Sequence, residues 1–205
     1  MHNPGRLFSV FHCAAASFMI LCGVASPVFA SPAVPQEVKF TAQVGKVRLQ
    51  SMLSQKGKKD SDPVSVNAKY LKFSPPLVID DVRKSSAQSS PEVETLRRYF
   101  IANLTGKPSE ILEFWEPGSR GRVAKLLNDP QLFKLNREGS LKDPSLRVVG
   151  ILFQNGTESV MCGSPGRETG MNLKKVGSKF LLVNEPADDL QLAIVEAALA
   201  QGKGN

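Results

Sequence analysis

The segment from Ser90 to Trp115 constrains the fold most, because its pattern is typical of two helices separated by a sharp stop. Ser90 offers a hydroxyl that can cap the first free backbone amides, and Pro91 stands where a missing N–H costs nothing. Apolar residues then recur three and four positions apart, on one helical stripe: Val93, Leu96, Phe100 and Leu104. Gly106 and Pro108 end this helix. The apolar stripe of the second, shorter helix consists of Ile111, Leu112 and Trp115.

Four strand-like runs follow these helices and form two expected hairpins, over residues 146–154, 157–162, 171–176 and 179–184. Asn155-Gly156 is the strongest short hairpin signal, since both residues tolerate positive φ, and Gly177-Ser178 suits a type II′ turn. Helical patterns at about 119–128 and 187–201 flank the strands. This order predicts an α+β domain over residues 90–201.

The preceding part of the chain, residues 31–85, predicts a β-rich extension. Alternation from Val38 to Val44 is typical of a half-buried strand, and Gly45-Lys46 can turn it into a second one. We therefore expect a β-hairpin over about 37–53. Residues 64–73 fit either a third strand or a short helix. A polar, serine-rich connector at 85–90 predicts the boundary between the extension and the main domain.

The first thirty residues have the pattern of a secretory signal peptide. Arg6 is followed by an uncharged apolar core, and the segment ends in a small-x-small cleavage pattern at Ala30. An uncleaved membrane anchor is the alternative. No other run approaches twenty apolar residues, so we expect no membrane span in the mature chain. The expected destination is the periplasm or the exterior.

Removal of residues 1–30 would restrict the available chemistry. Both histidines, His2 and His12, lie in that segment, and Cys162 is the one cysteine outside it. Zinc sites and nucleophile–histidine pairs depend on these residue types, so we expect no metal, no cofactor and no catalytic residue of those classes. Cys162 lies in an apolar run, which favours a buried thiol. The formal charge of +7 is spread along the chain, and no nucleic-acid partner is expected.

The chain resembles the NTF2-like superfamily, which includes SnoaL and ketosteroid-isomerase relatives. The resemblance lies in Leu96–Phe100, in Gly106–Trp115 and in Lys174–Val183, and it covers about residues 90–185. It implies a strongly curved sheet wrapped on helices, forming a cone whose mouth often holds a small ligand. The histidines and the Asp–Tyr pair of catalytic members have no counterpart at matching positions.

Three aromatic residues are the candidate lining of a ligand pocket: Tyr99, Phe114 and Trp115. The alternative is ordinary core packing between helices and sheet. Glu110 and Glu113 lie one helical turn apart and could perform acid–base work if one were desolvated. Complementation of a helix dipole is the simpler explanation.

Arg120 and Arg122 are candidates for an anion site, because they stand beside glycines at an expected helix start. A solvated turn is the alternative.

These features favour an exported, non-catalytic binding module of the cell envelope, which holds a partner protein or a small apolar ligand in an NTF2-like cone. One alternative is an isomerase-like or hydrolase-like enzyme that uses Glu113 or Tyr99. That alternative requires a pocket into which the Glu113 carboxylate points. Another is an assembly protein that acts through homodimerisation.

Overall fold

The computed structural model describes residues 34–79, 90–138, 146–154, 156–184 and 189–202. The expected signal peptide (1–30) and most of the expected connector (85–90) lie outside these residues. Asn155 of the expected hairpin turn also lies outside them, whereas Gly156 adopts the positive φ that such a turn requires, 76°. Among the described residues, no helix is both long and apolar enough to span a bilayer.

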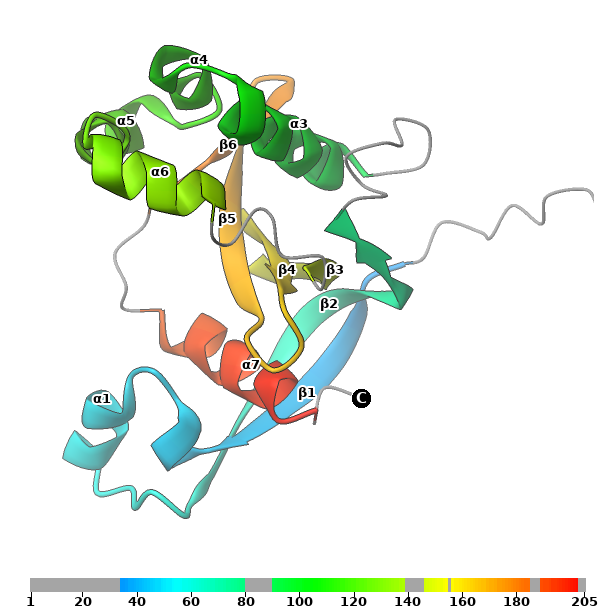
Figure 1. Cartoon of the computed structure of the whole chain (residues 1–205). Coiled ribbons are helices and arrows are strands. Elements are labelled where there is room, and N and C mark those ends of the chain that lie inside the picture. Colours follow the sequence, from blue (N-terminus) through cyan, green and yellow to red (C-terminus); the bar gives the residue numbers. More distant parts are fainter. Residues whose placement is uncertain (1–33, 80–89, 139–145, 155, 185–188, 203–205) are drawn as a thin grey trace, which may run out of the picture. The chain divides into compact units, whose positions relative to one another are not determined.

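Six antiparallel strands form one sheet in which each strand pairs with its neighbours in sequence (Figure 1). The strands are β1 (Gln36–Gln43), β2 (Pro63–Val78), β3 (Arg147–Gln154), β4 (Thr157–Gly163), β5 (Thr169–Val176) and β6 (Lys179–Leu182). The four expected strands of the main domain and their two hairpins are therefore confirmed. The second hairpin turns at Gly177, whose φ is 62°, between the paired residues Val176 and Lys179.

The hairpin expected over 37–53 is wrong. β1 is present, but the chain then forms a 3-10 turn, η1 (Val44–Lys46), and a short helix, α1 (Gln50–Gln55). Val47 and Leu53 are buried in the core from this helical connection, so their apolar spacing is satisfied without a strand. The partner of β1 is instead β2, beyond the lysine-rich loop.

Residues 64–73, which fitted either a strand or a helix, belong to the long strand β2. Its first half pairs with β1 and its second half with β3, with a register shift between Lys72 and Leu77. The strands of the N-terminal extension and of the main domain thus share one sheet. Residues Ala33–Asn205 form one compact unit.

Helices cover both faces of the sheet (Figure 1). Among the described residues, the helices between β2 and β3 are α3 (Pro91–Thr105), α4 (Pro108–Leu112), α5 (Pro117–Leu127) and α6 (Pro130–Glu138); α7 (Leu190–Ala200) follows β6. The Ser90 hydroxyl accepts from the Val93 amide at the start of α3, as its position predicts. α7 contacts β1, β2 and β5. Because β1 and β5 are not neighbours in the sheet, contact with both shows that the sheet curves around α7.

The core consists of two layers separated by the sheet. Ile151 packs under α3 with Val160 and Leu173, whereas the adjacent Leu152 packs under α7 with Phe40. Alternate residues of a strand point to opposite faces, so β3 supplies both layers. A third, smaller cluster joins α4 to α5 through Ile111, Val123 and Leu127. The fold is α+β, with a curved antiparallel sheet between two helical layers.

Candidate functional site

The three aromatic candidates cluster at the junction of α3 with the segment after α4. The Tyr99 ring makes edge-to-face contacts with Phe114 and Trp115, at centroid separations of 6.1 and 5.9 Å. Burial raises the pKa of Tyr99, and hydrogen bonds with Asn103 and Trp115 offset part of this rise. Tyr99 and Trp115 both pack against two core clusters. The structure therefore assigns Tyr99 to core packing.

The segment after α4 runs beside the end of β6. Leu182 donates its amide to the Phe114 carbonyl at 2.8 Å, and its own carbonyl accepts from the Glu116 amide at 2.9 Å. Trp115 and Leu182 thus form an isolated parallel bridge. This bridge covers the outer edge of β6 at one residue.

An open groove lies between α3 and β6 and has a volume of about 460 Å³. We call it the α3–β6 groove. Its walls come from α3, from the segment after α4, from α5 and from the β5–β6 turn and β6: Pro91, Glu94, Thr95, Arg98, Glu113, Phe114, Arg120 and Ser178–Leu181. The groove therefore brings together three of the seven candidate residues, Glu113, Phe114 and Arg120.

Among the described residues of the groove, most of the charged side chains that form no ion pair are basic. Arg98 lies over the Phe114 ring at 5.8 Å, and Arg120 is held by a 2.9 Å bond from its Nε to the Trp115 carbonyl. Lys179 is exposed at the start of β6. Of the acidic residues there, Glu94 is paired with Arg97 at 2.6 Å. Electrostatically, the groove favours an anionic group.

The expected pair of arginines does not form one site. Both lie within the first two turns of α5, which begins at Pro117, as their position predicted. Arg120 enters the α3–β6 groove, whereas Arg122 is exposed and is not part of its lining. Residues two apart on a helix point in nearly opposite directions, which separates the two guanidinium groups.

The edge of β6 faces this groove with unpaired backbone groups. The bonds of Leu182 to Phe114 and Glu116 point away from β5. Backbone groups two residues apart in a strand lie on the same edge, so the N–H and C=O of Phe180 also point away from β5. No described residue bonds to them. Phe180 lines the groove, and the sequence pattern did not single it out.

The two glutamates proposed for acid–base work are both exposed. Glu110 accepts from the Lys107 amide at 3.0 Å and so caps α4. Glu113 stands on the groove wall. Both carboxylates are exposed, so neither has the desolvation that acid–base work by this pair requires, whereas Glu113 does line a groove.

A different carboxyl pair has the desolvated environment that acid–base work by Glu110 and Glu113 would require. Glu92 is buried in the first turn of α3, and Glu158 lies half-buried on β4. Burial, a hydrogen bond with Glu92 and repulsion by its charge raise the pKa of Glu158 to about 7, and Lys175 opposes this shift. The two residues are far apart in sequence, and no local pattern links them.

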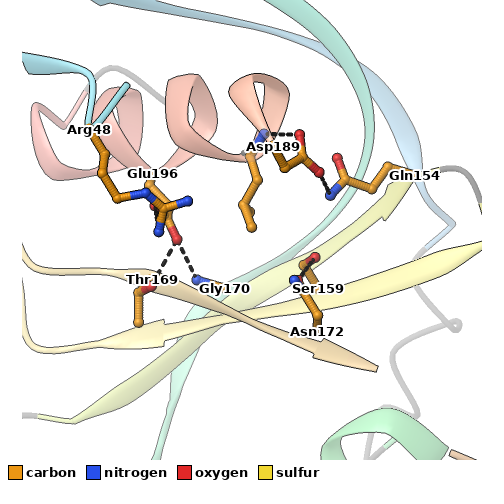
Figure 2. Close-up of polar contacts among 9 residues, drawn as sticks. Arg48, Gln154, Ser159, Thr169, Gly170, Asn172, Asp189 and Glu196 are labelled. Carbon is orange, nitrogen blue, oxygen red and sulfur yellow. Dashed lines mark hydrogen bonds and ion pairs between the residues drawn. The ribbon is translucent and has the colours of Figure 1, made fainter. Parts of the chain in front are cut away.

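A second cavity, of about 300 Å³, lies between α7 and β5. We call it the α7 pocket. Figure 2 shows the polar contacts around it: Glu196 on α7 accepts from Thr169 and Gly170, and Asp189 accepts from Gln154. The candidate Trp115 lines this cavity, so consecutive residues Phe114 and Trp115 contribute to different sites.

A scan against models of known protein families finds no match to this chain, and searches of curated proteins and of solved structures find none either.

Proposed function

We propose that this chain is an exported, non-catalytic binding module of the cell envelope that holds an extended acidic segment of a partner protein in the α3–β6 groove. The observation that carries the proposal is the backbone of Phe180, whose N–H and C=O face the groove without a partner among the described residues. Addition of a strand to an exposed sheet edge is a recurrent mode of peptide recognition.

The charge of the groove supports an acidic partner. Arg98, Arg120 and Lys179 line it, while Glu94 is already paired with Arg97. The exposed Glu113 remains as the opposing charge. Side chains of an added strand alternate in direction, so one acidic residue of the partner would face these cations while the next side chain points to solvent.

The packing of Tyr99 favours a protein partner over a small apolar ligand as the occupant of the α3–β6 groove. Tyr99 is occupied by contacts with its aromatic neighbours and with the core, so it does not line an apolar cavity. We further propose that the fold is an NTF2-like cone. A curved antiparallel sheet packed on helices is consistent with this relationship.

A panel of labelled peptides tests this function. Extended peptides with two aspartates, and matched peptides with asparagine or lysine in their place, are titrated by fluorescence polarisation at low and at physiological salt. We expect the aspartate peptides to bind, and to bind more weakly as salt screens the charges. Phe180→Pro removes the outward N–H, and Phe180→Ala is its matched control, because both substitutions remove the ring. Edge positions of this kind tolerate proline.

The proposal requires Phe180→Pro to weaken binding by about tenfold more than Phe180→Ala, because a backbone hydrogen bond is lost. Arg98→Glu and Lys179→Glu should weaken aspartate peptides selectively, and Lys46→Glu, at an exposed position in η1, should not. Equal affinity of Phe180→Pro and Phe180→Ala would exclude pairing with this edge.

A second copy of the chain is the competing occupant of the same edge. Sedimentation of residues 31–205 without peptide distinguishes the two. We expect a monomer at micromolar concentration. A dimer that Phe180→Pro dissociates would replace the partner protein with self-assembly.

A further inference from the structure

The α7 pocket is a built polar cavity that the proposed peptide groove does not use. Its polar lining comes from Arg48, Asn172, Asn184, Asp189 and Glu196. Apolar contact area comes from Trp115, Met171, Leu182 and Leu192. Polar groups that converge beside apolar walls occur in small-molecule sites, and 300 Å³ lies at the lower end of the usual size of such sites.

The two acidic groups are held in place by neighbouring donors. Glu196, whose side chain is 12% exposed, accepts from the Thr169 hydroxyl at 2.8 Å and from the Gly170 amide at 3.0 Å. Its other oxygen lies 3.6 Å from the Arg48 guanidinium. Asp189 accepts from the Leu192 amide at 3.0 Å and from Gln154 at 2.7 Å. Rigid carboxylates of this kind can accept further hydrogen bonds from a ligand.

Asn172 provides an oriented donor on the opposite wall. Its side-chain oxygen contacts the Ser159 hydroxyl (Figure 2), at a distance of 2.5 Å. Ser159 is fully buried. The hydroxyl donates to this oxygen, so the NH2 group of Asn172 keeps both of its protons for other acceptors. Asn172 lines the cavity, and no bond from this NH2 group to a described residue forms.

The charge of the lining restricts the ligand class. Among the described lining residues, Asp189 and Glu196 outnumber Arg48 by one charge, and this disfavours an anion. The ion pair between Arg48 and Glu196 lowers the attraction for a cation. A neutral molecule whose groups both donate and accept hydrogen bonds matches Asn172 on one side and the carboxylates on the other. Hydroxyl groups have this dual property.

We propose that the α7 pocket binds a neutral polyhydroxylated ligand of about one sugar residue. Its hydroxyls accept from the Asn172 amide and donate to Asp189 and Glu196, and its apolar face lies against Trp115 or Leu192. This site is separate from the α3–β6 groove, so either can be occupied alone.

A charge-matched sugar series tests the proposal on residues 31–205. Glucose, galactose, mannose and N-acetylglucosamine are the neutral probes, with glucuronate and glucosamine as the charged comparators. Binding is measured by ligand-observed NMR and by chemical-shift changes at the Asn172 side-chain amide. We expect at least one neutral sugar to bind more tightly than both charged ones and to shift the Asn172 signals.

Asn172→Ala should weaken that binding by about tenfold, whereas Asn67→Ala, at an exposed position on β2, should leave it unchanged. Thermal unfolding of both variants shows whether the fold is retained, and Asn172→Ser, which keeps a short polar group, serves as the second variant. Absence of binding by every neutral sugar at saturating concentration overturns the proposal. Preferential binding of glucuronate or glucosamine, or binding that survives both Asn172 substitutions, overturns it equally.

Discussion

Leu182 donates its amide proton to the Phe114 carbonyl across 2.8 Å, on the side of β6 that faces away from the sheet. This bond covers the edge of β6 at Leu182 and leaves it uncovered at Phe180. Exposed strand edges readily pair with other chains, and proteins commonly cover them. Here the cover ends where the basic groove begins. The position of the uncovered residue is therefore the basis of the proposed function.

Stability should depend on pH through Glu158. Its pKa of about 7 in the folded protein lies above the ordinary value of 4.5. A raised pKa means that the folded state binds the proton more tightly, so this contribution to stability is complete below pH 4.5 and is lost as pH rises through 7. Glu158→Gln cannot ionise. Between pH 4.5 and 7, the free energy of unfolding of Glu158→Gln should therefore increase relative to that of the natural chain, as measured by urea denaturation. A constant difference would contradict the paired-carboxyl environment.

The start of α7 should depend on Asp189. Its carboxylate caps the Leu192 amide at 3.0 Å and binds Gln154 at 2.7 Å. Asp189→Ala should lower the free energy of unfolding by about 1–2 kcal/mol, since both bonds are lost. Asp189→Asn keeps a hydrogen-bond acceptor, so it should lower the free energy of unfolding by less. Chemical denaturation compares the two, and equal stability of Asp189→Ala and the natural chain would show that α7 needs no cap.

Gly170 lies close to the Leu192 side chain of α7, so a branched side chain at this position should be unfavourable. A Cβ at this position would lie 2.8 Å from Cδ1 of Leu192. Gly170→Val should cost about 1–3 kcal/mol by overpacking. The matched control is Gly121→Ala within α5, where a Cβ meets nothing within 4 Å and alanine favours the helix. Thermal unfolding should show the first variant destabilised and the second unchanged or stabilised.

The thiol of Cys162 should be unreactive in the folded protein. Cys162 is buried in the layer under α3, and burial raises its pKa to about 12. Because the thiolate is the reactive form, alkylation of residues 31–205 should proceed only through unfolding. Its rate should rise with urea in step with the unfolded fraction. Rapid labelling of the native chain would show that Cys162 is accessible.

Local signals predicted much of the fold. The strands of the two C-terminal hairpins follow from alternation and turn residues, and Ser90 caps its helix as its position suggests. The hairpin at 37–53 failed because alternation at Val47 and Leu49 also fits a short helical connection. The choice between them depends on β2, whose pairing with β1 and β3 joins residues distant in sequence.

The site was predicted only in part, because it too is formed by residues that are distant in sequence. Glu113, Phe114 and Arg120 meet in one groove, but Lys179 and Phe180 reach it from a strand more than fifty residues later in the chain. Tyr99 shows the opposite case, since an aromatic residue on an apolar stripe fits a pocket and a core equally well. Pairs such as Ser159 and Asn172 become visible only through the register of β4 with β5.

Amide hydrogen exchange at Phe180 is the most direct test of the central claim. Exchange is followed by NMR with and without a saturating aspartate peptide, and Leu181, whose amide faces β5, serves as the internal reference. A paired strand would slow exchange at Phe180 and leave Leu181 little changed. If the peptide binds but Phe180 exchanges as fast as in the free protein, the partner does not pair with the β6 edge, and the proposed mode of recognition is wrong.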